Sequence, residues 1–391
     1  MKKILIVTIA ALLCLQAGAQ QWGPSDKDAT PQAKALFSRL QKIQKKGCMY
    51  GHQDDLVTGR TWWEEPGRSD TKESLGDFPG VVGFELGELE LGGIHSLDSV
   101  NFYTIVDRLK WFHAQNGIIT LSWHVVNPIS SQWPGIKEPN GAGSAWEVDF
   151  LSAEGDNAVR SVLPGGCNHA MFNSWLDRLS KFMLCLKDQN GDLIPVLFRP
   201  YHEHSGSFFW WGKTRCTNEE YASLYRYTVD YLRAKGCHHI LFMYNTDKVY
   251  SAEEYLEGYP GDDYVDVLSI DWYGSGEEFN KNVDAALKFT TDLAAKKHKL
   301  HSLSECGPLS TDLQKILKKY ESSYVLTWRN SPGRGHANTG FNASRVPDPS
   351  RANAPRRPMN FNAQQQVRED PMKVMKADKH YLFLQDIQNI K

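Results

Sequence analysis

Short apolar runs separated by polar segments recur along the chain and set its predicted architecture. The runs are nearly continuous in apolar residues and do not alternate cleanly with polar ones, which is typical of parallel strands buried on both faces. Eight strands are predicted, at Cys48–His52, Gly80–Leu86, Gly117–Val126, Leu193–Tyr201, His239–Asn245, Val265–Tyr273, Leu300–Glu305 and Tyr324–Trp328.

Helical patterns fill several of the intervals between these runs. The clearest begins at Thr217, whose hydroxyl can accept the amide of Glu220 while the Glu220 carboxylate reaches back, and it ends at Lys235-Gly236. Strands that alternate with helices predict a parallel sheet, and eight such units predict a single α/β domain, a closed (β/α)8 TIM barrel. No Gly-x-Gly-x-x-Gly segment follows a predicted strand, so the fingerprint of a dinucleotide-binding fold is lacking. Further helices are predicted at Ser99–Gln115, Phe172–Leu186, Val283–Lys297 and Ser310–Tyr320.

The start of the chain has the pattern of a secretory signal peptide. Two lysines precede an apolar run over residues 4–15, and small residues at 17–19 form a cleavage site, so residues 1–19 are predicted to be removed. The run is too short for a membrane anchor. Because Leu13 is a poor residue before a lipidated cysteine, simple export is favoured over lipidation at Cys14. We expect a secreted or periplasmic protein.

The remaining residues, 20–391, are predicted to form the one barrel domain. Residues 331–378 stand apart as a polar tail that is rich in Pro, Arg, Asn and Gln. This composition predicts a long loop or a partly disordered segment. Helical periodicity returns at Tyr381–Ile390, which is predicted to dock as a closing helix.

Charge and aromatic content narrow the class of partner. The formal net charge is −2, and it becomes −4 once Lys2 and Lys3 are removed, so neither a nucleic-acid surface nor membrane insertion is indicated. Aromatic residues make up 12% of the chain, with 12 Trp. Ring faces can cover the apolar faces of pyranose sugars, so this content favours a carbohydrate cleft, although Trp-rich cores also exist.

The cysteines do not form a dense disulfide framework. Export would allow them to oxidise, and Cys167 and Cys216 in loop-like segments are the pair that we expect to form a disulfide. Cys185 and Cys237 lie in helical or helix-end contexts and are predicted to be buried thiols. No Cys-x-x-Cys pair is present, which excludes a zinc ribbon.

Polar side chains gather where the apolar runs stop, which is where a barrel of this class builds its active site. Glu203 ends the fourth run and Glu305 ends the seventh, and these two strands face each other across the barrel mouth. A retaining glycosidase requires two carboxyl groups about 5–5.5 Å apart, one protonated to supply the leaving oxygen and one ionised to attack the anomeric carbon. We therefore interpret this pair as catalytic, against the alternative of loop carboxylates in salt bridges.

The neighbours of Glu203 supply further candidates. Arg199 can hydrogen-bond a carboxylate and hold it ionised, although a purely structural ion pair is nearly as well supported. His202 could bind substrate or orient Glu203, or it could be a buried histidine with its hydrogen bonds satisfied. His204 is left unassigned. Four rings in the segment Phe208–Gly212 cannot all face one core, so at least one is predicted to face the cleft.

A metal site is an alternative from another class of barrel hydrolase. The first strand lacks the His-x-His of such sites, and no lysine ends the fourth strand, so neither a catalytic metal nor a cofactor is expected. A structural calcium ion held by loop carboxylates is retained as an alternative. The side chains that could surround such a metal are His52, Asp54, Asp55, His124, His202 and His204.

Five segments, in order and spanning most of residues 48–330, carry a resemblance to a known family. They are R-P-Y-H-E-H-S-G-S-F-F-W-W-G (Arg199–Gly212), L-S-W-H-V-V-N-P (Leu121–Pro128), S-I-D-W-Y-G (Ser269–Gly274), S-E-C-G (Ser304–Gly307) and T-W-R-N (Thr327–Asn330). Together they resemble glycoside hydrolase family 26. The resemblance implies a (β/α)8 fold, a retaining mechanism and, for most members, endo-β-1,4-mannanase activity.

The resemblance also implies roles for single residues. Glu203 matches the family's acid/base and Glu305 matches its nucleophile. Tyr273 would hydrogen-bond the nucleophile or the sugar beside it, while Asp271 and Arg199 match supporting positions. The residues that match the lining of the sugar sites are His124, His202, Tyr273, Trp328 and Arg329, with Glu90 as a further carboxylate there.

Two features depart from the family pattern. Phe208 stands where the family usually has a Trp beside the acid/base, so it keeps an apolar wall against Glu203 but loses the indole N–H. The tail after Arg329 is more basic and polar than the usual family ending. Because of that difference, the resemblance does not define the distal side of the cleft, so endo and exo action are both retained as alternatives.

The expected function is double-displacement hydrolysis of β-1,4-mannosidic bonds in mannan, galactomannan or glucomannan by a monomeric enzyme. Alternatives on the same scaffold are an exo-acting mannanase that releases mannobiose, a β-1,3-xylanase and a mixed-linkage β-glucanase. A carbohydrate-binding protein without catalysis is the alternative outside the enzymes. The presence of both carboxylates argues against it.

Overall fold

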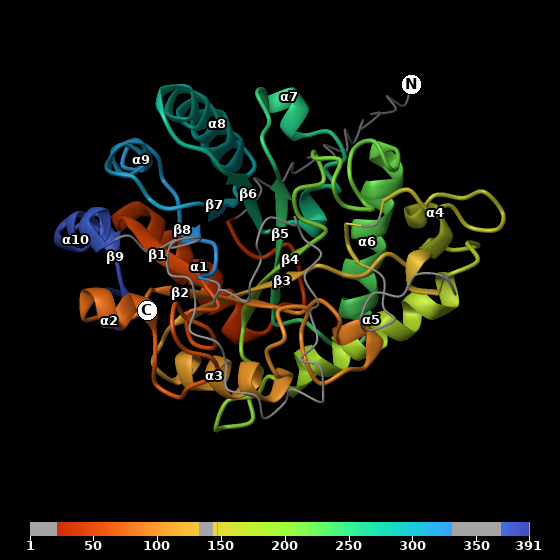
Figure 1. The fold of residues 1–391 in the computed structure, drawn as a ribbon, viewed down its shortest axis with the longest axis horizontal. Coiled ribbons are helices and arrows are strands. Elements are labelled where there is room, and N and C mark those ends of the chain that lie inside the picture. The colour runs from red at the N-terminus through yellow and green to blue at the C-terminus, as the bar shows by residue number, and fades with distance from the viewer. Residues whose placement is uncertain (1–21, 133–143, 147, 331–368, 391) are drawn as a thin grey trace, which may run out of the picture.

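A closed barrel of parallel strands forms the centre of the computed structural model, which describes residues 22–132, 144–146, 148–330 and 369–390. Each strand pairs with the next along the chain, and the last pairs with the first, so the barrel closes (Figure 1). The predicted (β/α)8 TIM barrel is confirmed. Its strands are β1 (Cys48–Gln53), β2 (Val81–Glu85), β3 (Ile118–Trp123), β4 (Val196–Pro200), β5 (Ile240–Thr246), β6 (Val267–Trp272), β7 (Leu300–Cys306) and β8 (Tyr324–Thr327).

Helices surround these strands, and the five that the sequence predicts are confirmed with shifted ends (Figure 1). The helix predicted from Ser99 begins later, at Phe102, because Ser99 has a left-handed backbone (φ 62°) and Asn101 caps the first turn. The layer consists of α2 (Asp70–Leu75), α3 (Phe102–Ala114), α4 (Ala158–Val162), α5 (His169–Cys185), α6 (Asn218–Ala234), α7 (Ala252–Tyr255), α8 (Glu277–Lys296), α9 (Thr311–Leu317) and α10 (Glu369–Ala377), with short 3-10 turns at Leu89–Leu91, Ser130–Gln132 and Asp262–Tyr264.

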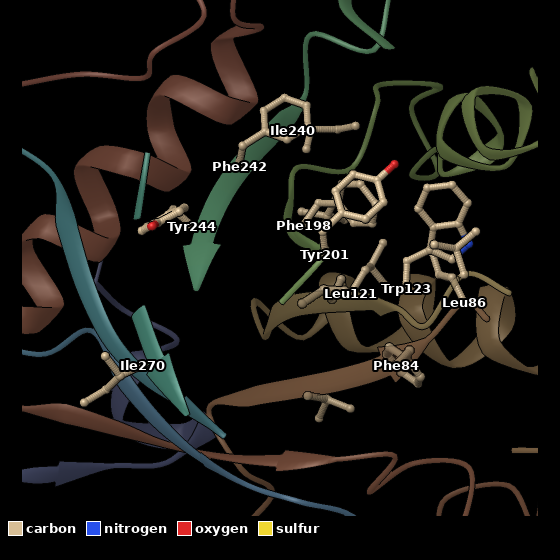
Figure 2. Packing of buried hydrophobic residues seen from close by; sticks show 14 of the residues in the cluster. Phe84, Leu86, Leu121, Trp123, Phe198, Tyr201, Ile240, Phe242, Tyr244 and Ile270 are labelled. Carbon is tan, nitrogen blue, oxygen red and sulfur yellow. The ribbon is translucent and has the colours of Figure 1, made fainter. Parts of the chain in front are cut away.

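Side chains along each strand alternate between the helical layer and the barrel interior. Phe198 on β4 and Phe242 on β5 belong to the large apolar cluster that includes residues of the surrounding helices (Figure 2). Leu197 and Leu241 join a second cluster inside the barrel. Helix α1 (Pro31–Lys46) adds its own apolar face to that second cluster and so closes the N-terminal end of the barrel.

The capping box predicted for α6 is present. The Thr217 hydroxyl accepts the backbone N–H of Glu220 at 3.2 Å, and the Glu220 carboxylate accepts the backbone N–H of Thr217 at 2.9 Å. Each bond satisfies an amide that the helix itself leaves without a partner.

Replacing Thr217 with alanine is therefore expected to lower the free energy of unfolding by about 1 kcal/mol. Thermal and denaturant unfolding followed by circular dichroism would measure the change. Ser223→Ala, in the middle of the same helix, is the matched control and should not destabilise the protein, since alanine favours helix interiors. Equal stability of Thr217→Ala and wild type would show that the cap contributes nothing.

The C-terminal segment differs from its prediction. Residues 331–368 of the polar tail lie outside the described residues, but Glu369–Ala377, predicted as loop, forms α10 and buries Met372 and Met375. Tyr381–Ile390 is not one helix: Tyr381–Leu382 forms a short strand, β9, parallel to the start of β1, and only Leu384–Ile387 (α11) is helical. The helical spacing was misleading because consecutive buried residues here pack against a strand edge.

The disulfide expected between Cys167 and Cys216 is wrong, because both are free thiols in the structure. Cys237 is buried, as predicted, whereas Cys185 is exposed. The predicted signal peptide, residues 1–19, lies outside the described residues. Within the described part of the chain, no helix has the length and apolar character needed to cross a membrane.

Candidate active site

Inward-facing positions change from apolar to polar toward the C-terminal ends of β4 and β6. On β4, Leu197 inside the barrel is followed two residues later by Arg199, and on β6, Val267 is followed by Ser269 and Asp271. The alternation of the strands therefore stacks a polar layer on an apolar one. All of these polar side chains are buried.

Three carboxyl groups meet in this polar layer. One oxygen from each of Glu203, Asp271 and Glu305 lies within 4.8 Å of the others, and all three residues are buried. Both predicted catalytic glutamates therefore reach the same point, from the ends of β4 and β7. The residue that follows β4, Tyr201, and Glu203 itself have left-handed backbones (φ 50° and 55°), a conformation that costs energy for residues other than glycine.

A β-bulge turns Glu305 into the site. Along β6 and β7, Ile270 pairs with Leu303, but the next pair is Asp271 with Glu305, so Ser304 is an extra residue in β7. Simple alternation from Leu303, which packs outward, would point Glu305 toward the helices as well. Because the bulge inserts one residue, both Ser304 and Glu305 face the barrel interior, and bulges are common beside active sites for this reason.

Both oxygens of Glu305 accept hydrogen bonds from the protein. Arg199 donates to Oε2 at 2.6 Å, and the Tyr273 hydroxyl donates to Oε1 at 2.5 Å. The same guanidinium also donates to Asp271. These donors stabilise the ionised form of the Glu305 carboxylate. The structure thus brings Arg199, Asp271 and Tyr273 together around Glu305, while their roles in the reaction stay predictions.

Glu203 has a different environment. Burial raises the pKa of its carboxyl group well above the ordinary value, and the neighbouring charges of Glu305 and Asp271 raise it further. A carboxyl group with this environment keeps its proton to a higher pH than an ordinary glutamic acid. The two glutamates therefore differ in their surroundings: burial and like charges surround Glu203, whereas two hydrogen-bond donors hold Glu305.

Asn245 at the end of β5 is a site residue that the sequence interpretation missed. Its side-chain oxygen accepts the backbone N–H of Glu203 at 2.8 Å, while its nitrogen donates to Asp271 and to Ser304, each at 2.8 Å. One amide therefore links strands β4, β6 and β7. The available signal was an asparagine at the inward end of an otherwise apolar run.

Two predicted histidines lie side by side next to Glu203. The Nε2 atoms of His124 and His202 are 3.1 Å apart, and Nδ1 of His124 is 2.7 Å from the Glu85 carboxylate. Trp146 stacks on the His124 ring with 5.0 Å between centroids. The arrangement holds both imidazoles rigidly beside the acid.

Comparison with known proteins identifies the family. The sequence profile of glycosyl hydrolase family 26 matches residues 25–343. The chain belongs to this family. A mannan endo-1,4-β-mannosidase of Bifidobacterium adolescentis is 31% identical over 345 residues, which cover 80% of this chain and 32% of that protein. The chain thus spans about a third of that relative's length.

Solved structures of family 26 proteins agree with this assignment. A GH26 β-mannanase from Bacteroides ovatus superimposes with a TM-score of 0.75 and 36% identity, covering 92% of this chain and 98% of that one. The catalytic domain of a GH26 endo-β-1,4-mannanase from a Bacillus species gives a TM-score of 0.76 and 26% identity, covering 95% and 96% of the two chains.

The aromatic segment after Glu203 in this family 26 chain is mostly buried. Phe209, Trp210 and Trp211 lie in the core, while Phe208 is 39% exposed. The prediction that the four rings would not all enter one core is confirmed. Phe208 packs edge to face on Phe209, with 4.7 Å between centroids, and its expected contact with Glu203 stays a prediction.

The remaining predicted sugar-site residues lie around the same end of the barrel. Trp328 follows β8 and is edge-on to His124, with 6.0 Å between centroids, and Arg329 pairs with Asp98 at 2.6 Å. Glu90 is buried, and its two oxygens accept from the Trp123 indole at 2.9 Å and from a backbone amide at 2.8 Å. Burial raises the pKa of Glu90 to about 7. A sugar contact for Glu90 stays a prediction.

Two of the histidines considered for a metal site contact other protein groups. His52 is bound to Asp55 at 2.6 Å, and the His204 nitrogens lie 3.1 and 2.8 Å from the carbonyl oxygens of Asn245 and Glu257. Among the described residues, the one group that could hold a cation is the carboxylate cluster already described. Two of its three carboxylates, Asp271 and Glu305, already pair with the Arg199 cation.

Proposed function

We propose that this chain is a retaining, endo-acting β-1,4-mannanase, with Glu203 as the acid/base and Glu305 as the nucleophile. The observation that carries the proposal is the approach of their carboxylate oxygens to within 4.8 Å. Retaining glycosidases hold the two groups about 5–5.5 Å apart, whereas inverting enzymes need about 6.5–9.5 Å for a water molecule between them.

The reaction proceeds in two displacements. The Glu203 carboxyl gives its proton to the glycosidic oxygen while a Glu305 oxygen attacks the anomeric carbon, which breaks the glycosidic bond and forms a glycosyl ester. Glu203, now ionised, then takes a proton from a water molecule whose oxygen attacks the same carbon. The ester bond breaks, and the carboxylate of Glu305 returns to Arg199 and Tyr273.

The substrate is proposed from the relatives. The Bifidobacterium relative is named for endo-1,4-β-mannosidase activity on mannan, and both solved relatives are described as mannanases. Because the chain covers only a third of the Bifidobacterium protein, mannan, galactomannan and glucomannan are proposed as substrates of this barrel by itself. No cofactor enters the proposed reaction.

Time-resolved product analysis tests the proposal. The full chain is incubated with linear β-mannan and with mannopentaose, with xylan and mixed-linkage β-glucan alongside, and products are followed by chromatography and proton NMR. We expect mixed mannooligosaccharides that first appear as β-anomers. Early α-anomers would contradict retention, mannobiose as nearly the sole early product would replace endo by exo action, and cleavage of only xylan or β-glucan would overturn the substrate.

A further inference from the structure

A buried chain of three side chains runs from β2 to the residue before Glu203. Glu85 lies 2.7 Å from Nδ1 of His124, and Nε2 of His124 lies 3.1 Å from Nε2 of His202. Their exposed fractions are 1%, 6% and 1%. Neither the catalytic displacement nor the family resemblance gives Glu85 a role.

The hydrogen bonds of Glu85 determine which nitrogen of His124 carries a proton. Its Oε1 accepts the backbone N–H groups of Gly87 at 2.5 Å and His124 at 2.9 Å, and its Oε2 accepts the Ser122 hydroxyl at 2.6 Å. Burial opposes ionisation, but the hydrogen bonds from the His124 ring, the His124 backbone and the Ser122 hydroxyl lower the pKa of Glu85. An ionised carboxylate can only accept, so His124 carries its proton on Nδ1.

The state of His202 follows from that of His124. Burial lowers the pKa of His202 well below its ordinary value, and the charge of Arg199 lowers it further, so His202 is neutral. With a single proton, on Nδ1, His124 has a lone pair on Nε2, and His202 then donates from its own Nε2. That assignment leaves the lone pair of His202 on Nδ1, a buried atom without a hydrogen-bond partner among the described residues.

We propose that Glu85 is a positioning residue that holds a single proton of His124 on Nδ1 and thereby fixes the tautomer of His202, so that Nδ1 of His202 accepts a hydroxyl of the sugar bound beside Glu203. The proposal rests on the function proposed above. A hydroxyl that donates its hydrogen gains electron density on oxygen, which stabilises the positive charge of an oxocarbenium-like transition state more than it stabilises the bound sugar.

Glu85→Gln tests this chain of hydrogen bonds with little change in shape. The amide oxygen of Gln has to face the two backbone N–H groups, so its NH2 group faces His124 and donates to Nδ1. His124 then carries its proton on Nε2 and His202 carries its proton on Nδ1. In this variant the sugar hydroxyl can accept a hydrogen bond from the Nδ1–H of His202, so we expect KM to change by less than about threefold. Because the hydroxyl no longer donates to His202, we expect kcat to fall about 10- to 100-fold.

Nitrogen NMR of the full chain labelled with ¹⁵N-histidine reads the tautomers directly, without turnover. His124→Asn and His202→Asn assign the two rings. We expect Nδ1–H on His124 and Nε2–H on His202 in the wild type, and both reversed in Glu85→Gln. Nδ1–H on His202 in the wild type would overturn the inference even if the variant fails to fold, and it would leave the mannanase proposal untouched.

Asp26→Asn is the matched control. Asp26 is also a buried carboxylate bound to a histidine, with His238 Nδ1 at 2.8 Å, but it precedes α1 at the opposite end of the barrel. This variant should leave both tautomers and kcat unchanged. If Glu85→Gln reverses the tautomers but kcat stays within about twofold of the control, the tautomer has no role in catalysis and the inference fails.

Discussion

Replacing Glu203 with alanine is expected to lower kcat on mannan by about 10³-fold, since general-acid assistance contributes about 10²- to 10⁴-fold. A dinitrophenyl β-mannobioside, whose leaving group needs no proton, should still form the glycosyl ester on Glu305. Azide should then attack that ester and give the β-mannosyl azide. Glu305→Ala should lose on the order of 10⁵-fold or more, and azide should attack the substrate directly to give the α-mannosyl azide.

The pair of azide products separates the roles of the two glutamates. The same azide anomer from both variants, or a Glu203→Ala rate within about threefold of wild type on mannan, would contradict the assignment. Glu219→Ala is the control, because this carboxylate is 78% exposed on the barrel's outer layer, where it pairs with Arg226. That variant should retain wild-type activity.

The pH profile gives an independent readout of Glu203. Its pKa is raised, so the acid form persists above the ordinary glutamic acid range and is lost as the pH rises through the raised pKa. We therefore expect kcat/KM of the wild type to fall on the alkaline side, and Glu203→Ala to lack this alkaline limb on the dinitrophenyl substrate. Retention of the limb in the variant would assign it to another group.

Arg199→Met is expected to have the largest effect on stability. Arg199 is the cation that Asp271 and Glu305 share, and all three side chains are buried. Removing one partner of a buried ion pair costs about 3–5 kcal/mol, because the remaining charge is left uncompensated. Activity should fall at least 100-fold as well, since Glu305 loses the donor that stabilises its ionised form.

A second substitution distinguishes charge from packing in this effect. Asp271→Asn in the Arg199→Met background removes one uncompensated carboxylate and should restore part of the unfolding free energy without restoring activity. Arg199→Lys keeps the charge but cannot span both carboxylates, so it should fall between wild type and Arg199→Met. Unchanged thermal stability of Arg199→Met would show that the cluster does not depend on the guanidinium.

The barrel strands could be predicted from sequence because each is a short apolar run with a local signal. The facing of individual side chains could not always be predicted. Alternation counted along β7 from Leu303 places Glu305 on the helix side of the barrel. Only the pairing with β6 reveals that Ser304 is an extra residue. Register between strands is set by contacts between distant segments, so a single sequence carries no direct record of it.

Other errors have the same origin. Asn245 was overlooked because its hydrogen bonds go to residues of three other strands. The strand β9 was predicted as helix because its partner, the start of β1, is more than 300 residues away in the chain. The Cys167–Cys216 pairing required a distance that sequence does not contain. In contrast, the meeting of Glu203, Glu305, Arg199 and Tyr273 at one end of the barrel was predictable, because they lie at or just after the C-terminal ends of predicted strands.

Inside the barrel, the apolar layer and the polar layer stacked on it have different roles. Residues such as Leu197 and Val267 hold the strands together, while Arg199 and Asp271, which lie two and four residues further along β4 and β6, carry buried charges. Because Arg199 and Asp271 form a buried ion pair, a single substitution in the polar layer is expected to change the chemistry and the stability together. A change of specificity in this barrel is therefore expected to need paired substitutions that keep the buried charges balanced.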